Sequence, residues 1–173
     1  MLISKEMNAA INEQIGNELA ASNQYVAIAT YFDGEGLPSL AKHFYRQALE
    51  EREHAMRLVK YLVDADGEVE IPAIPAPQPR FSSAEDAVRL SYDSEMRVTG
   101  QITQLMDRAE KESDYMSRNM LEWFIAEQRE EVSSMDTLLR MVRRAGESGL
   151  LFVENYLSQG GNVEHDGDEG DDD

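Results

Sequence analysis

The chain has 173 residues, 42% of them hydrophobic and 29% charged, with a formal net charge of −18 and no cysteine. This length fits one domain with a substantial core, while the charge disfavours nucleic acid and anionic membranes as partners. No apolar run is long enough to span a membrane, and no signal peptide or disulfide framework is expected. We therefore expect a cytoplasmic protein that attracts cations.

Two long helices are predicted in the first part of the chain. Ser4 is a good cap for a helix that runs to about Asp33, where glycines follow. A second helix opens near Pro38 and ends between residues 64 and 67. Apolar residues recur at steps of three and four along both, which defines one buried face on each helix. A glutamate interrupts each apolar face, Glu18 in the first helix and Glu51 in the second.

An extended connection follows, because residues 66–81 contain four of the five prolines. Ser82 and Glu85 read as a capping box that starts a third helix, whose apolar face is interrupted by Glu95. A break near residues 112–114 leads to a fourth helix with Gln128 and Glu131 on its apolar face. Short links make the helices antiparallel within each pair, and the long connection makes the second and third helices parallel. The predicted fold is an all-α four-helix bundle with a long crossover between helices two and three.

A short fifth helix is predicted over residues 147–157, and a bundle standing alone is expected to leave its leucines exposed. Residues 162–173 hold seven acidic residues and no Lys or Arg, which leaves a charge of −11 on residues 1–161. We expect residues 159–173 to form a disordered acidic tail behind a domain of residues 1–158.

The polar residues on the apolar faces follow a repeated spacing. Glu18 and Glu51 are 33 residues apart and His54 comes three later; Glu95 and Gln128 are also 33 apart, and Glu131 comes three later. Residues three apart on a helix share one face. All of them lie near helix midpoints, so the bundle should bring them together at mid-height.

Their charges indicate a metal site. Four carboxylates facing one another in a dry core repel, and two divalent ions cancel their charge. Oxygen-rich ligands with one imidazole and no thiolate suit iron or manganese. Metals in dinuclear sites lie about 3.5–4 Å apart, a gap that a carboxylate such as Glu51 can bridge. For a single glutamate the simpler interpretation is a slightly rotated helix, and for His54 a core histidine, but the repeated set favours ligands.

These residues resemble those of a prokaryotic non-haem ferritin over about residues 5–158. The resemblance is carried by Asn17-Glu18-Leu19, by residues 50–55 and by residues 127–131. It implies a ferroxidase centre whose first iron is held by Glu18, Glu51 and His54. The second iron would be held by Glu51, Glu95 and Glu131, with Gln128 nearby. A third iron position in this family maps onto Glu50, Glu127 and Glu130.

Three further residues bear on the chemistry. Bacterioferritins bind haem through a Met directly after the bridging glutamate; Arg52 occupies that position here, so we expect no haem. The family carries a tyrosine that can supply an electron to oxygen, which corresponds to Tyr25; an ordinary core aromatic is the alternative. Trp123 is a second possible electron source, for which simple core packing is favoured. His43 is expected on the surface.

The resemblance implies oxidation of Fe(II) by O2 or peroxide and storage of Fe(III) as mineral in a shell of twenty-four subunits. The fifth helix would pack around the four-fold axes of that shell. Two alternatives stay open from the residues alone. One is a ferritin-like di-iron oxidase or peroxidase without storage, such as a rubrerythrin-like protein, although those commonly carry a Cys-rich module. The other is a structural bundle whose buried acids only set the register of its helices.

Overall fold

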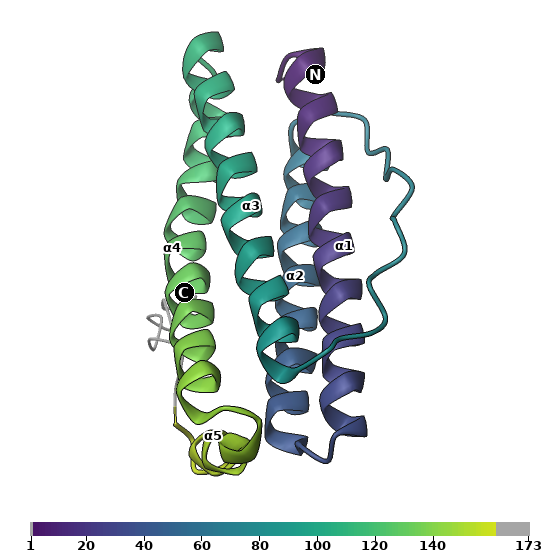
Figure 1. Cartoon of the computed structure of the whole chain (residues 1–173). Helices are drawn as coiled ribbons and strands as arrows, with labels where there is room; N and C mark the ends of the chain where they lie inside the picture. Colours follow the sequence, from purple (N-terminus) through teal and green to yellow (C-terminus); the bar gives the residue numbers. More distant parts are fainter. Residues whose placement is uncertain (1, 162–173) are drawn as a thin grey trace.

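The computed structural model describes residues 2–161, which fold into a bundle of long helices (Figure 1). The elements, in chain order, are α1 (Lys5–Gly34), α2 (Pro38–Asp64), α3 (Ala84–Glu112), α4 (Tyr115–Ala145), the 3-10 turn η1 (Glu147–Gly149) and α5 (Leu150–Ser158). The predicted all-α class, the four long helices and the short fifth helix are confirmed. No helix among the described residues is both long and apolar enough to cross a bilayer.

Local signals in the sequence explain most of the helix ends. The Ser4 hydroxyl accepts a hydrogen bond from the Met7 amide at the start of α1, and Gly36 takes a positive φ of 73° after its end. The predicted cap of α3 was one residue too early. Ser83, not Ser82, is the N-cap and accepts from the Asp86 amide, while the Asp86 carboxylate accepts from Ser82. The sequence contains two overlapping Ser-x-x-acid patterns, Ser82 with Glu85 and Ser83 with Asp86, and the serine of the second pattern caps the helix.

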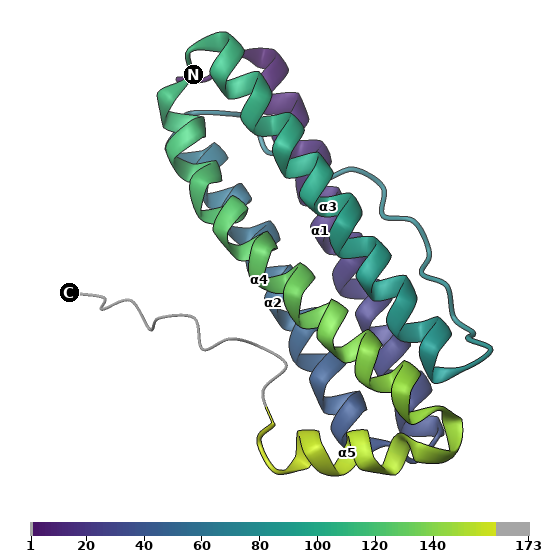
Figure 2. The same cartoon turned by 60° about the vertical axis from the view of Figure 1, so that its left-hand side comes forward.

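The crossover between α2 and α3 runs along the outer side of α1 (Figures 1 and 2). Amide side chains of α1 hold the crossover in place. Each one donates a hydrogen bond to a backbone carbonyl of the crossover and accepts one from a backbone amide. Asn8 pairs in this way with Glu68, and Gln24 pairs with Gln78. Between them the chain passes so close to Gly16 that a Cβ there would collide with Pro72. The predicted extended connection is thus fastened along its length, which holds α2 and α3 parallel.

The buried apolar side chains form two clusters, one toward each end of the bundle. The cluster that contains Phe32 and Phe44 lies next to α5, and the cluster that contains Ile11 and Phe124 lies next to the chain's first residues. Between the two clusters each long helix carries buried polar residues instead. The core is therefore two apolar halves separated by a polar layer.

Helix α5 closes one end of the bundle (Figure 2). The expectation that its leucines are exposed in a single chain was wrong for Leu150, which is buried with Val153 against the neighbouring apolar cluster. Leu151 and Phe152, in contrast, are 70% and 80% exposed. The helix thus divides its apolar residues between its own bundle and the outside.

His43 was expected on the surface, and this was wrong. Its side chain is 5% exposed, packs edge-on against Phe44 and lines a cavity between α2 and the end of α5. The α5 segment provides that cover, and the periodicity of α2 alone does not reveal it. Of the predicted disordered tail of residues 159–173, residues 162–173 lie outside the described part of the chain.

Candidate metal centre

The polar layer is built by the four long helices at mid-height. Its members are almost completely inaccessible, with exposed fractions between 1% and 5%: Glu18, Glu51, His54, Glu95, Gln128 and Glu131. Each replaces an apolar residue on a helix face that is otherwise buried. The structure therefore brings together all six residues that the repeated spacing pointed to.

Glu18 from α1 and Glu51 with His54 from α2 form one close group of ligands. One ligand atom from each of the three lies within 4.8 Å of the others, and the His54 Nδ1 atom is 3.5 Å from a Glu51 oxygen. The 33-residue separation works because α1 and α2 are antiparallel partners, so their midpoints face each other. This is the predicted first-iron set.

Glu131 meets His54 from the opposite side of the bundle. A second group of ligand atoms within 4.8 Å of one another joins His54, Glu127 and Glu131. The His54 Nε2 atom is 3.8 Å from a Glu127 oxygen. The imidazole therefore lies between the acids of α2 and those of α4, and Glu127 is closer to the centre than the resemblance implied.

Glu95 is held by hydrogen-bond donors from two other helices. The Tyr25 hydroxyl donates to Glu95 Oε1, and the Gln128 amide donates to Glu95 Oε2 at 3.1 Å. The same amide nitrogen lies 3.3 Å from the Thr99 hydroxyl. Gln128 thus turns its nitrogen toward a carboxylate, which suits a residue that positions Glu95 more than one that binds a cation.

The proposed third iron position is only partly assembled. Glu50 accepts a hydrogen bond of 2.5 Å from Gln47 and lies 3.6 Å from Arg46, while Glu130 lies 3.7 Å from Arg129. Neither acid belongs to the two close ligand groups found among residues 2–161. Of the three predicted residues, Glu127 alone joins such a group.

The electrostatics of the layer fit cation binding. Burial raises the pKa of Glu51 well above its usual value, and the neighbouring carboxylates of Glu95 and Glu18 raise it further. Burial also raises the pKa of Glu131. Burial lowers the pKa of His54, but Glu127 and the other acids outweigh this and raise it. The layer therefore binds protons more tightly than exposed carboxylates do, because its acids are buried and lie close to one another.

Unpartnered atoms test whether a metal fits here. Glu18 Oε2, both carboxylate oxygens of Glu51 and His54 Nδ1 are buried without a hydrogen-bond partner. A buried polar atom without a partner costs about 1–3 kcal/mol. Four such atoms in one group, all of the kind that ligate iron or manganese, fit a pair of divalent ions.

Two features near the layer carried little signal in the sequence. Gln14 is 2% exposed and donates to Glu18 Oε1 at 2.8 Å; it lies one turn before Glu18, a spacing that could have indicated it. Trp123 packs edge-on against His54 with ring centroids 5.5 Å apart, and Arg57 lies 3.9 Å from the centre of its ring. The predicted packing role of Trp123 thus includes contact with a candidate ligand.

Comparison with known proteins agrees with this arrangement. Residues 8–145 match the Ferritin family model, described as a ferritin-like domain. Ferritin BfrB of Mycolicibacterium smegmatis is 48% identical over 91% of this chain and 86% of its own length. A bacterial non-heme ferritin of Staphylococcus aureus is 34% identical over 88% of this chain and 92% of its own.

Solved structures show the same fold. The open pore ferritin of Archaeoglobus fulgidus superimposes with a TM-score of 0.87 at 34% identity, covering 90% of this chain and 96% of that one. The family match, residues 8–145, begins in the first turn of α1, reaches the end of α4 and includes every residue of the polar layer. The chain belongs to the ferritin family.

Proposed function

We propose that this protein is an iron-storage ferritin with ferroxidase activity. The observation that carries the proposal is the buried layer of four carboxylates and one imidazole, several of whose ligand atoms have no partner. Family membership and relatives named as ferritins support it. Iron is the substrate and the stored cargo of this site.

The two irons are held by overlapping sets of ligands. Glu18 and His54 bind the first Fe(II), and Glu51 bridges to the second, because its carboxylate lies in the same close group as Glu18 and His54 and both of its oxygens lack a hydrogen-bond partner. Glu95 and Glu131 complete the second position. The two irons are not equivalent, since the first ligand set includes the His54 imidazole and the second has the Gln128 amide beside it.

Glu127 lies at the edge of the proposed dinuclear site, beside His54 and Glu131. Its closeness to His54 and Glu131 lets it take up iron that leaves the dinuclear site or arrives there. A third iron held by Glu50, Glu127 and Glu130 remains a prediction from the resemblance. It requires the Glu50 side chain to leave Gln47.

The chemistry needs electrons from the metal and protons from solvent. Two Fe(II) each lose one electron, and the pair reduces O2 with two protons to hydrogen peroxide, or hydrogen peroxide with two protons to two waters. The carboxylates favour the oxidised product because they stabilise Fe(III) more than Fe(II). Cations compete with protons for Glu51 and Glu131, because burial raises the pKa of both carboxyls.

Storage requires assembly. We propose a shell of twenty-four subunits in the cytoplasm. We also propose that it binds no haem, since the exposed Arg52 occupies the position directly after the bridging glutamate. The exposed Leu151 and Phe152 of α5 provide an apolar contact for neighbouring subunits. Acidic residues facing the interior would attract Fe(II) and nucleate mineral.

A titration of the apoprotein tests the proposal. Anaerobic addition of Fe(II) followed by air should give fast oxidation of about two or three irons per chain, then slower soluble uptake far beyond that. Oxidation that stops at the first irons would indicate an oxidase without storage, and absence of iron binding would leave a structural bundle. Sizing of the particle, expected at several hundred kilodaltons, checks the shell independently.

A further inference from the structure

One cavity of this acidic chain is lined by basic residues. It has a volume of about 440 Å³ and lies at the end of the bundle that α5 closes (Figure 2). Lys42, His43 and Arg46 line it from α2, and Ser39 lines it one turn earlier. The lining residues on the opposite side come from the end of α5 and are uncharged: Leu157, Ser158, Gly160 and Gly161. We call this cavity the α2–α5 basic cavity.

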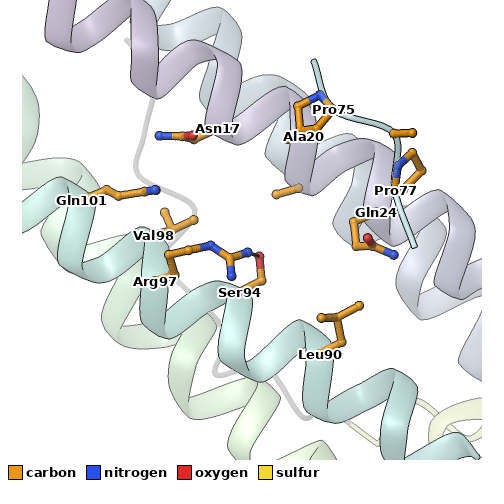
Figure 3. Close-up of a pocket in the computed structure, with 12 residues that line it drawn as sticks. Asn17, Ala20, Gln24, Pro75, Pro77, Leu90, Ser94, Arg97, Val98 and Gln101 are labelled. Atoms are coloured by element: carbon orange, nitrogen blue, oxygen red, sulfur yellow. Dashed lines mark hydrogen bonds between the residues drawn. The ribbon is translucent and has the colours of Figure 1, made fainter. Parts of the chain in front are cut away.

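Other cavities of the bundle differ from it in charge. Glu6, Glu112 and Asp114 line one of about 670 Å³, which has no Lys or Arg among its described lining residues. A cavity of about 290 Å³ between α1 and α3 has Arg97 as its one charged lining residue in the described part of the chain. Figure 3 shows that side chain beside Ser94, to which it donates at 3.1 Å. The α2–α5 basic cavity therefore gathers positive charge in a chain whose net charge is −18.

Helical spacing brings the polar groups of the cavity together. Ser39, Lys42 and Arg46 follow one another at steps of three and four residues, so their side chains leave α2 on one face. Like charges four residues apart on a helix repel each other. The Arg46 Nε atom lies 3.6 Å from Glu50, one turn further on, whereas Lys42 forms no hydrogen bond or ion pair within residues 2–161. An anion held between Lys42 and Arg46 would remove their repulsion.

Neighbouring groups do not cancel this positive charge. Burial, followed by the charge of Arg46, lowers the pKa of His43 to about 4, so the charged group that acts on this imidazole is a cation. Glu154 approaches the same end of α2, but its carboxylate accepts from the backbone amides of Ser39 and Leu40 and does not line the cavity. These observations indicate a positive potential in the cavity, which attracts anions.

The donors of the cavity suit a tetrahedral oxyanion. Lys42 carries a point charge with three N–H donors, and Arg46 carries a planar fork of N–H groups that matches two oxygens of one phosphate. The Ser39 hydroxyl adds a donor of the kind that bonds phosphate oxygens. A phosphate dianion balances the charge of both basic side chains, whereas chloride or a single carboxylate balances only one of them.

We propose that the α2–α5 basic cavity binds phosphate, with Lys42 and Arg46 neutralising the anion and Ser39 donating a hydrogen bond. The bound phosphate joins α2 to the end of α5, because the opposite wall of the cavity is built there. The inference does not rest on the proposed function, since no residue of the cavity belongs to the candidate metal centre. It gives the protein a second ligand, at the end of the bundle away from the chain's first residues.

Equilibrium dialysis with radiolabelled inorganic phosphate tests the site. The assembled protein is first freed of iron with a reductant and a chelator, because ferric mineral binds phosphate itself, and sodium chloride keeps the ionic strength constant. We expect saturable binding of about one phosphate per chain. Lys42→Gln should weaken binding about tenfold or more, because a hydrogen bond to a charged group is lost. Lys60→Gln removes the same charge from the same helix outside the cavity, so it is the matched control and should leave the affinity unchanged.

Equal weakening in the Lys42 and Lys60 variants would overturn the site, because phosphate would then respond only to net charge. Absence of saturable binding to the unmodified, iron-free protein would overturn it as well. Arg46→Lys provides a second variant, since it keeps the charge and loses the planar fork; an unchanged affinity would refute the contact with Arg46. Lys42 is exposed, so its variant is expected to assemble, which particle sizing checks.

A chain that ends at Gly161 provides the last arm of the experiment. It lacks residues 162–173, which carry seven acidic residues and no Lys or Arg. Phosphate should bind to the complete chain with at most a modest gain on truncation. Binding that occurs only after truncation would overturn the proposal, because carboxylates of the chain itself would then compete successfully for the cavity.

Discussion

The Tyr25 hydroxyl donates a hydrogen bond to Glu95, from α1 to α3 across the bundle. Tyr25 is fully buried, and burial with the nearby Glu95 raises its pKa well above 10, so it stays protonated at neutral pH. A hydrogen bond to a charged group contributes about 1.5–3 kcal/mol. This bond fixes one ligand of the proposed second iron.

Replacing Tyr25 with Phe should therefore slow the fast phase of Fe(II) oxidation by about tenfold or more. Assembly should be unaffected, because the ring still fills the core. Stopped-flow absorbance after mixing with aerobic buffer measures the rate. Tyr45→Phe is the matched control, since its hydroxyl bonds only the exposed Asp33; equal slowing in both variants would contradict a specific role for Tyr25.

Glu51→Ala should abolish the fast oxidation phase while the shell still assembles, because the two irons lose their shared ligand. Glu53→Ala, two residues away and exposed, should leave the phase intact. Stopped-flow kinetics and particle sizing provide the two measurements. Fast oxidation that survives in the Glu51 variant would refute the bridging role.

The apoprotein should lose stability as pH rises through the raised pKa of Glu51. A carboxyl whose folded pKa exceeds its unfolded value stabilises the fold fully below the unfolded pKa, and that contribution is lost as pH increases through the folded one. Glu51→Gln should make the metal-free protein more stable at pH 7 and flatten this dependence. Thermal unfolding between pH 4.5 and pH 8 measures it; a less stable variant at pH 7 would count against the repulsion among the buried acids.

His43 should make the protein lose stability as pH falls, which is opposite in direction to the effect expected from Glu51. Burial, followed by the charge of Arg46, lowers its pKa from 6.5 to about 4. The unfolded chain then takes up the proton first, so stability present above pH 6.5 is lost as pH falls toward 4, by about 3 kcal/mol. His43→Gln should reduce this acid loss in denaturant unfolding at pH 7 and pH 4.5. If the variant loses the same amount of stability between pH 7 and pH 4.5, groups other than His43 cause the loss.

Glu154 should matter for stability without touching the metal centre. Its carboxylate, on α5, accepts from the backbone amides of Ser39 and Leu40 at the start of α2, where the N-cap Leu37 offers no side-chain bond. Glu154→Ala should destabilise the subunit by about 1–2 kcal/mol, as loss of a helix cap does. Chemical denaturation measures this, and Asn155→Ala, exposed on the same helix, should have little effect.

Glu18, Glu51, Glu95 and Glu131 could be found from the sequence because helical periodicity is a local property. An acid in an apolar stripe is visible from its neighbours, and the repeated 33-residue spacing aligned the stripes of antiparallel partners. The prolines similarly revealed the crossover, since they exclude helix wherever they occur in number. These features depend on residues close in the chain, so no three-dimensional information was needed.

The tertiary structure decided which side chains meet between different helices. Gln128 bonds Glu95, Glu127 approaches His54, and α5 buries His43 and caps α2. Each depends on the rotation and offset of one helix against another, which side-chain packing determines and local periodicity does not. The sequence by itself therefore determined which residues form the buried acidic layer, and only the packed bundle decided which partner each of them meets and which of their atoms remain without a hydrogen-bond partner.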